Sequence, residues 1–268
     1  MEYRELGSTG EMVSEIGLGT WKYKGGPGPL HKGIELGANL IDTAEMYRTE
    51  DAVGAAIKDR RDKVFLATKV LGSNLRHDAV LRAAENSLRL LDGDVIDLYQ
   101  IHWSNRSVPI AETMGAMEEL VERGMVRHIG VSNFSVAEMK EAQQAMTKNP
   151  LVSNQVLYNL KNRQIERDLV PYCADNDITI IAFTPLADGS LAGRSRFLPD
   201  RRGSVLEQLA KEVGKTPAQV ALNWCLSRPN MIVIPKTNSV ERTIENCAAS
   251  GWSLTTDQVA MLDNAFPL

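Results

Sequence analysis

The sequence predicts an α/β fold, a (β/α)8 TIM barrel with an N-terminal β-hairpin that caps the bottom of the barrel. Eight apolar or β-branched runs of strand length lie at residues 16–20, 39–41, 64–68, 95–101, 126–131, 152–156, 178–183 and 231–234. Several runs are continuously apolar, which is typical of strands buried on both faces of a parallel sheet. Helical patterns separate them, and right-handed crossovers make such strands parallel. An open doubly wound sheet is the alternative that periodicity alone does not exclude.

The chain has 268 residues, a length that suits one barrel. We expect a single domain over residues 1–268, because no linker, internal repeat or low-complexity tract divides the sequence. The opening segment is predicted to form the hairpin, with its turn at residues 7–10. The interval from 184 to 230 is long enough for a loop at 184–203 followed by two helices.

Helix faces and helix starts support this order of elements. Apolar residues three or four apart predict buried helix faces, and these are Leu81, Ala84, Leu88 and Leu91; Met114, Met117, Leu120 and Val121; and Leu206, Leu209, Ala210 and Val213. Four capping-box patterns predict helix starts, at Ser135 with Glu138, Ser204 with Glu207, Thr216 with Gln219, and Thr255 with Gln258. A last helix is expected at about 256–264.

Composition narrows the possible partners and locations. The formal net charge is −4 and no basic run is dense, so neither nucleic acid nor an anionic membrane is expected as a partner. No window approaches 18 uninterrupted apolar residues, and the charged, glycine-broken N-terminus does not resemble a targeting peptide. The three cysteines, Cys173, Cys225 and Cys247, lack metal-ligand spacing and fit buried thiols. We therefore expect a cytoplasmic protein without a metal.

Polar residues follow the predicted strands, and barrel active sites lie at the carboxyl ends of strands. Asp42 and Tyr47 follow the second strand, Lys69 the third and His102 the fourth. Further polar or aromatic pairs end the later strands, namely Ser132-Asn133, Asn154-Gln155, Phe183-Thr184 and Pro235-Lys236. Four proton-active groups on three successive strands predict an active site at this end.

The four groups suit delivery of a proton to a developing alkoxide. A phenol has a pKa of about 10, and a neighbouring ammonium lowers it. A carboxylate keeps the ammonium charged and in place, while an imidazole orients a carbonyl oxygen. No nucleophile is paired with a base and no metal ligands cluster, so the hydride must come from a nicotinamide coenzyme.

The coenzyme site is predicted away from the usual glycine-rich motif, because no GxGxxG follows any strand. The segment after the last strand carries Lys236 and Arg242 at a helix N-terminus, where backbone amides favour an anion. Two cations there favour a 2′-phosphate, and hence NADPH; NADH remains a weaker alternative.

These motifs resemble the aldo-keto reductase family over essentially the whole chain. The matching segments are RELGSTGEMVSEIGLGTW (4–21), LIDTAEMY (40–47), VFLATK (64–69), DLYQIHW (97–103), IGVSNFS (129–135), IAFTPLA (181–187) and VIPKTNSVERTIEN (233–246). The resemblance implies an NADPH-dependent carbonyl reductase. By that analogy Tyr47 is the general acid, its pKa lowered by Lys69, which Asp42 holds, and His102 orients the carbonyl.

The resemblance also implies the binding residues. Ser132, Asn133 and Gln155 would bind the nicotinamide carboxamide, and Phe183 would stack on the ring. The remaining expected coenzyme residues are Gly19, Thr20, Trp21, Asp42, Thr184, Pro185, Leu186, Ser190, Ile234, Lys236, Thr237, Asn238, Arg242, Glu245 and Asn246. Substrate would contact Tyr47, His102, Trp21 and Trp103.

Departures from the family pattern suggest the substrate. Phe183 stands where tyrosine is common, which keeps the π face and loses a hydroxyl. RTED replaces GNE after Tyr47, which can bring Arg48 to the pocket rim. Only residues 265–268 follow the last helix, so we expect an open pocket walled by Trp21 and Trp103, suited to small aldehydes, ketones or dicarbonyls, in a monomer or weak homo-oligomer.

Two other functions remain open at this point. A Schiff-base lyase would use Lys69 as nucleophile, but this requires a lowered lysine pKa that Asp42 and Tyr47 oppose. An NADPH-binding regulatory subunit would retain the coenzyme and barely turn over.

Overall fold

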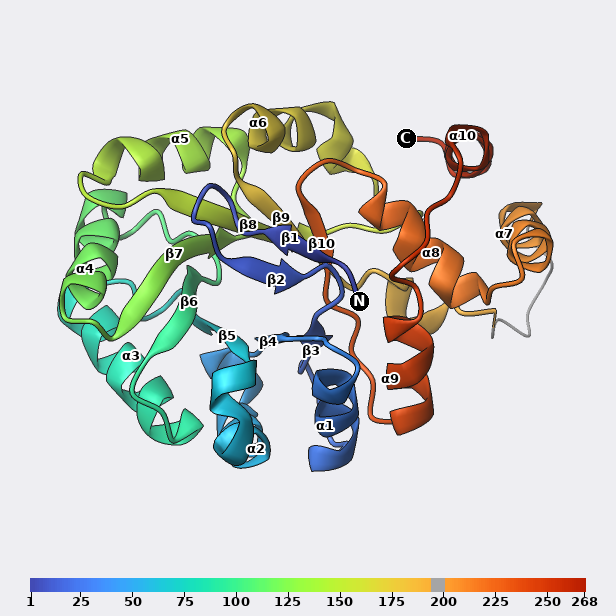
Figure 1. The fold of residues 1–268 in the computed structure, drawn as a ribbon. Coiled ribbons are helices and arrows are strands. Elements are labelled where there is room, and N and C mark those ends of the chain that lie inside the picture. Colours follow the sequence, from blue (N-terminus) through green and yellow to red (C-terminus); the bar gives the residue numbers. More distant parts are fainter. Residues whose placement is uncertain (194–200) are drawn as a thin grey trace.

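The protein is described by a computed structural model that covers residues 1–193 and 201–268. Eight parallel strands form a continuous sheet in the order β3 to β10, curled into a barrel (Figure 1). Parallel bridges between Ile16 and Val233 and between Gly19 and Lys236 join its two edges. The closed barrel confirms the predicted fold and removes the open doubly wound alternative.

Each predicted run overlaps a strand of this barrel. The strands are β3 (Leu18–Gly19), β4 (Leu40–Asp42), β5 (Phe65–Val70), β6 (Ile96–Ile101), β7 (Val126–Ser132), β8 (Leu151–Leu157), β9 (Thr179–Phe183) and β10 (Met231–Val233). Strand β3 is shorter than the expected 16–20. At residues 15–17 the backbone hydrogen bonds that join the two edges of the sheet reach only Val233.

The predicted hairpin is confirmed as β1 (Tyr3–Glu5) and β2 (Met12–Ser14), which pair antiparallel. Figure 1 shows it lying across one end of the barrel. Leu6 and Val13 of this segment are buried and join the apolar cluster inside the barrel, which includes Leu40, Phe65 and Leu98. The hairpin therefore closes the bottom of the barrel with hydrophobic side chains.

Helices surround the sheet. They are α1 (Pro27–Glu35), α2 (Glu50–Ile57), α3 (His77–Leu91), α4 (Ile110–Glu122), α5 (Val136–Ala145), α6 (Leu169–Asp175), α7 (Arg201–Glu212), α8 (Pro217–Leu226), α9 (Val240–Cys247) and α10 (Thr256–Ala265). Short 3-10 helices lie at η1 (Glu45–Tyr47), η2 (Lys58–Lys63), η3 (Gln164–Arg167) and η4 (Ala187–Gly189). Helices α7 and α8 are the two expected before the last strand, and α10 packs against α7.

Three of the four predicted capping boxes are present, at Ser135, Thr216 and Thr255. The prediction for Ser204 is wrong, because α7 begins at Arg201 and Ser204 lies inside its first turn. A capping-box pattern marks a helix start only where the preceding residues leave the helical conformation. The expected loop at 184–203 is therefore shorter, and its residues 194–200 lie outside the described part of the chain.

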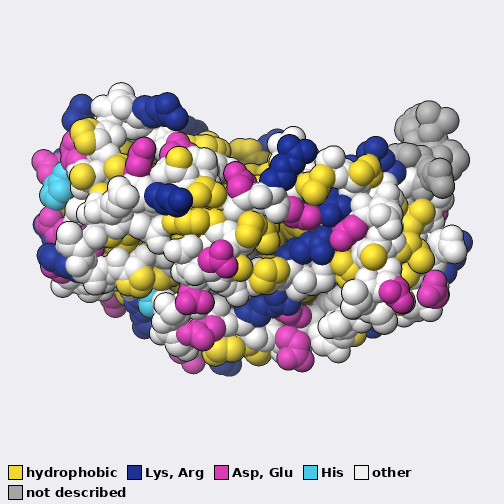
Figure 2. Space-filling view, turned by 90° about the horizontal axis from the view of Figure 1, so that it is seen from above, with side chains coloured by type: hydrophobic (Ala, Val, Ile, Leu, Met, Phe, Trp, Pro, Cys, Tyr) yellow, Lys and Arg dark blue, Asp and Glu magenta, His cyan; other side chains and the backbone are white. Residues whose placement is uncertain are grey.

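The surface mixes charged and apolar side chains, and the cysteines lie in the interior. Positive and negative side chains are interspersed with apolar ones on the face drawn in Figure 2. Within residues 1–193 and 201–268, no helix is both long and apolar enough to cross a membrane. The three cysteines are free and buried as predicted, and burial raises the pKa of each thiol.

Candidate active site

The interior of the barrel changes from apolar to polar toward the carboxyl ends of its strands. Alternate residues of a strand face the same side, so Leu40 is followed inward by Asp42, and Phe65 by Lys69. His102 directly follows β6. Tyr47 ends the 3-10 helix η1 rather than lying in an irregular loop. All four predicted catalytic residues thus meet at one end of the barrel.

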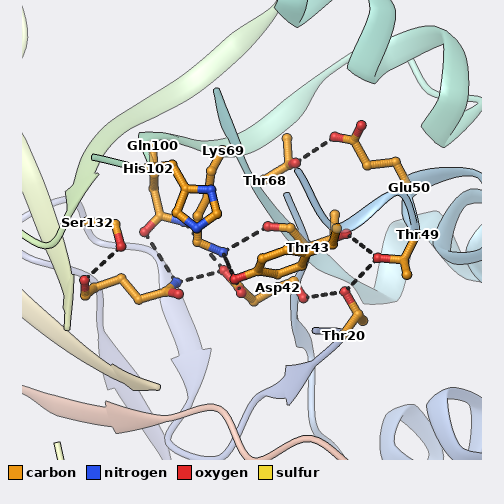
Figure 3. Close-up of polar contacts among 12 residues, drawn as sticks. Thr20, Asp42, Thr43, Thr49, Glu50, Thr68, Lys69, Gln100, His102 and Ser132 are labelled. Atoms are coloured by element: carbon orange, nitrogen blue, oxygen red, sulfur yellow. Dashed lines mark hydrogen bonds and ion pairs between the residues drawn. The ribbon is translucent and has the colours of Figure 1, made fainter. Parts of the chain in front are cut away.

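Lys69 is the centre of this cluster and is fully buried. Its Nζ donates to Asp42 Oδ1 at 2.7 Å, to the carbonyl oxygen of Thr43 at 2.9 Å and to Tyr47 Oη at 3.4 Å. Figure 3 shows the first two of these contacts, with His102 beside the lysine. An ammonium has three N–H donors, so each donor of Lys69 has a partner.

Asp42 is held by amides as well as by the lysine. Its Oδ2 accepts from Gln155 Nε2 at 2.7 Å and from Gln100 Nε2 at 3.4 Å. The main-chain oxygen of Gln155 accepts from Ser132 Oγ at 2.8 Å. Since Gln155 Nε2 is engaged, only its Oε1 remains to accept from a carboxamide N–H. Sequence reasoning missed Gln100, whose role depends on the register of neighbouring strands.

Burial and neighbouring charges shift the pKa values of Lys69 and Tyr47 in opposite directions. Burial acts to lower the pKa of Lys69, but Asp42 and Tyr47 outweigh it and the net change is upward. This is the opposite of what a Schiff-base lysine requires. Burial raises the pKa of Tyr47, and the charge of Lys69 only partly offsets it. The contribution of Lys69 to the pKa of Tyr47 is downward, as predicted, but burial outweighs it and the net change is upward, so the phenol is protonated at neutral pH.

His102 is neutral at physiological pH. Burial, with a smaller contribution from the charge of Lys69, lowers its pKa to about 3. Its ring stacks on Trp103 at a centroid distance of 3.8 Å and meets the Tyr47 ring edge-on at 5.5 Å. The Trp21 ring also packs against the Tyr47 ring, with the ring centroids 4.9 Å apart. A neutral imidazole carries one N–H, which can donate to a carbonyl oxygen.

A cavity of about 840 Å³ opens onto this cluster. Every predicted coenzyme residue lines it except Asn238, whose Oδ1 instead accepts from the Lys24 backbone N–H at 2.9 Å. Trp103 lines it too, whereas Lys69 lies beneath it and the exposed Arg48 does not reach it. Lining residues that the sequence did not single out are Lys22, Met46, Asp188, Gly189, Ala192, Ala218 and Pro235.

One end of the cavity fits an anionic group. Lys22, Lys236 and Arg242 line it, and Arg242 lies in the first turn of α9. Desolvation, and then the charges of Lys24, Arg242 and Lys22, lower the pKa of Lys236. Cations that disfavour one another's charge are stabilised by a bound phosphate. The donor set therefore fits the phosphate-bearing end of NADPH, as the sequence predicts.

The wall of the cavity includes a strained turn at residues 184–188. Thr184, Ala187 and Asp188 have φ values of 52°, 47° and 53°, and such backbone is unfavourable for a β-branched residue. Fully buried Asn159 donates from Nδ2 to the Thr184 carbonyl at 3.0 Å. Sequence reasoning missed Asn159, because a polar residue just past a strand gives no sign of the distant turn it contacts.

No group of three or more His, Cys, Asp or Glu side chains within residues 1–193 and 201–268 is arranged to hold a metal ion.

Comparisons with known proteins agree with this geometry. The family model "Aldo/keto reductase family" matches residues 15–266. Methylglyoxal reductase YeaE of Escherichia coli is 38% identical over 280 residues, covering 100% of this chain and 96% of that protein. Glyoxal reductase of Bacillus subtilis is 33% identical over 254 residues, covering 92% and 87%. An aldo/keto reductase from Klebsiella pneumoniae, solved with NADP and acetate, superposes with a TM-score of 0.88 at 37% identity, covering 99% and 95%. The chain therefore belongs to the aldo/keto reductase family.

Proposed function

We propose that the protein reduces the carbonyl group of small aldehydes, ketones or dicarbonyls with NADPH, reversibly with the corresponding alcohols. The observation that carries the proposal is the contact of Lys69 Nζ with both Asp42 Oδ1 and Tyr47 Oη at the floor of the cavity. A protonated phenol and a fixed positive charge held together at this point would stabilise an alkoxide as it forms, which supports the proposal.

The residues divide the work as follows. When bound, NADPH supplies a hydride to the carbonyl carbon. Tyr47 donates its phenolic proton to the carbonyl oxygen, and Lys69 stabilises the phenolate that remains. Neutral His102 donates a hydrogen bond that orients the same oxygen. Trp21 and Trp103 flank these groups.

The coenzyme would lie along the cavity between this cluster and the cationic end. Ser132, Asn133 and Gln155 would hold the carboxamide, and the ring of Phe183 would stack on the nicotinamide. Lys236 and Arg242 would bind the 2′-phosphate, which favours NADPH over NADH. The Klebsiella relative solved with NADP supports this choice.

Relatives named as methylglyoxal and glyoxal reductases support small dicarbonyls as the substrate class. The exposed fractions of Trp21 and Trp103, 44% and 40%, leave these walls open at the substrate end. Small, polar carbonyl compounds suit an aromatic-walled site of this kind better than a ligand that requires full enclosure.

The test is the Tyr47→Phe variant. Loss of the general acid is expected to lower kcat by a factor of about 10² to 10⁴, while the Kd for NADPH stays within about twofold. Steady-state turnover of methylglyoxal and fluorescence titration with NADPH and NADH provide the two measurements. Unchanged turnover in Tyr47→Phe would exclude Tyr47 as the acid. Slow single turnover with tight coenzyme retention in the wild type would instead support a regulatory, NADPH-binding subunit.

A further inference from the structure

Three threonine hydroxyls connect the start of α2 to the catalytic cluster (Figure 3). Thr49 Oγ1 lies 3.0 Å from Thr43 Oγ1 and 3.3 Å from Thr20 Oγ1. Thr20 Oγ1 donates to the main-chain oxygen of Asp42 at 2.9 Å. All three threonines are buried. Thr49 is the middle member of the three. It precedes α2, whereas Thr20 and Thr43 directly follow strands β3 and β4.

Thr49 occupies the N-cap position of α2 but does not cap it, since no side-chain cap hydrogen bond is made there. A threonine at this position ordinarily accepts from a backbone N–H in the first turn. Ser135, Thr216 and Thr255 do so at the starts of α5, α8 and α10. The hydroxyl of Thr49 is instead directed toward Thr43 and Thr20.

Thr43 is in turn fixed from several sides. Its N–H donates to the Ala67 carbonyl at 2.9 Å, its hydroxyl contacts Thr49, and its own carbonyl accepts from Lys69 Nζ. Lys69 has three N–H donors, which go to Asp42, Thr43 and Tyr47. The donors of an ammonium are tetrahedrally disposed, so the positions of the first two acceptors decide where the third points.

Glu50, the residue after Thr49, holds the strand that carries Lys69. Its Oε1 accepts from Thr68 Oγ1 at 2.6 Å, and Thr68 precedes Lys69 in β5. Glu50 is buried. Thr49 and Glu50 at the start of α2 therefore have complementary contacts. Thr49 holds Thr43, whose carbonyl accepts from Lys69, and Glu50 holds the strand that carries Lys69.

We propose that Thr49 is a positioning residue for the proton donor: its hydroxyl fixes Thr43 so that the Thr43 carbonyl directs the Lys69 ammonium at Tyr47 Oη. The inference deepens the proposed function, on which its catalytic consequence rests. Removing the Thr49 hydroxyl loosens Thr43, lets the ammonium turn away from Tyr47 and weakens the effect of its charge, which lowers the pKa of the phenol.

The other titratable groups around the lysine and the phenol are left in place in the test. They are Asp42 from β4, Glu45 from η1, Glu50 from α2 and His102 after β6. A change in the titration of Tyr47 then reports on the placement of Lys69.

The test compares Thr49→Val with Thr49→Ser, which keeps the hydroxyl. For Thr49→Val we expect a fall of about tenfold in kcat for methylglyoxal reduction, with the Kd for NADPH within about twofold. The pKa of Tyr47 is expected to rise by about half a unit or more. It is measured by ultraviolet difference titration of each protein against its Tyr47→Phe counterpart, which needs no turnover. Thr49→Ser should restore both values.

Two further variants complete the design. Thr43→Val removes the same hydrogen bond from its other partner and should reproduce the Thr49→Val result, which covers the case in which Thr49→Val does not fold. Thr255→Val removes a true N-cap at α10 and should lower stability without moving the titration of Tyr47. Wild-type kcat and an unmoved Tyr47 titration in the valine variants would overturn the inference. A shifted titration in a protein that turns over no carbonyl would uphold it and overturn the proposed function instead.

Discussion

The catalytic cluster contains a buried cation whose position is more constrained than its charge requires. Asp42 alone would keep Lys69 protonated, yet the ammonium also donates to Thr43 and Tyr47. Arginine in its place would offer a planar fork rather than three tetrahedral donors. The geometry thus explains why a lysine, and not merely a positive charge, stands beside the phenol.

His102 provides a prediction for the pH dependence of stability. Its pKa is lowered to about 3 in the folded protein, against about 6.5 in the unfolded chain. Between these values the unfolded state binds the extra proton, so stability falls as the pH drops from 6.5 toward 3. We expect the imidazole to account for a loss of about 3 kcal/mol between pH 7 and pH 4.

Urea unfolding of the wild type and of His102→Gln at both pH values measures this loss as a difference. The glutamine variant keeps a polar group but cannot titrate, so its stability should decline less over the same range. Carboxylates and His128 contribute equally to both proteins and cancel. Parallel declines would show that His102 is not held neutral by the fold.

At the scale of elements, the turn that follows β9 requires support from outside itself. Thr184 has a positive φ, and residues held in such backbone cost roughly 1–3 kcal/mol each unless their surroundings impose the conformation. Asn159, just past β8, supplies a donor to the Thr184 carbonyl while its Oδ1 accepts from the backbone N–H groups of Lys161 and Asn162. One side chain thus ties the loop after β8 to the cavity-lining turn after β9.

The Asn159→Asp variant separates these two tasks. Aspartate keeps the acceptor for Lys161 and Asn162 but lacks the N–H donor to Thr184, and it brings a negative charge near a carbonyl oxygen. We expect the Kd for NADPH to rise about tenfold, equivalent to about 1.4 kcal/mol, while kcat at saturating coenzyme changes less than about threefold. Fluorescence titration and steady-state kinetics provide the two values.

Asn162→Asp is the control, because it adds a negative charge to the exposed part of the same loop without touching Thr184. Its coenzyme affinity should stay near that of the wild type. Equal losses in the two variants would assign the effect to charge and not to the hydrogen bond.

The elements differ in how far the sequence could predict them. Helix starts at Ser135, Thr216 and Thr255 were predictable because a capping box is a local pattern. The start of α7 was not, because residues before Ser204 also stay helical. The site behaves likewise: strand ends place Asp42, Lys69 and His102, but the contact of Gln155 with Asp42 joins residues 113 apart and follows only from strand register.

At the scale of the whole molecule, the barrel is divided along its axis into an apolar half and a polar half. Leu6 and Val13 of the hairpin seal the apolar half, which includes Leu40, Phe65 and Leu98. Further along the same inward faces lie Asp42 and Lys69 of the polar cluster. Alternation of side chains predicted which residues face inward, whereas the net upward shift in the pKa of Tyr47 depends on how deeply the closed barrel buries the phenol.

Closure of the barrel depends on a close approach of backbones at Gly19. Gly19 bridges to Lys236, and a Cβ on Gly19 would lie 2.7 Å from the carbonyl oxygen of Ile234. Because the obstacle is backbone, it cannot move aside without opening the joint between β3 and β10.

We expect Gly19→Ala to destabilise the protein by about 2 kcal/mol and to lower its melting temperature by about 4–8 °C. Gly115→Ala is the control. Apart from its chain neighbours and the nearby backbone of α4, no atom of residues 1–193 and 201–268 lies within 4 Å of a Cβ at that position, and alanine there should stabilise by about 0.5–1 kcal/mol. A Gly19→Ala protein that melts at or above the wild-type temperature would show that the two edges of the sheet have room to part.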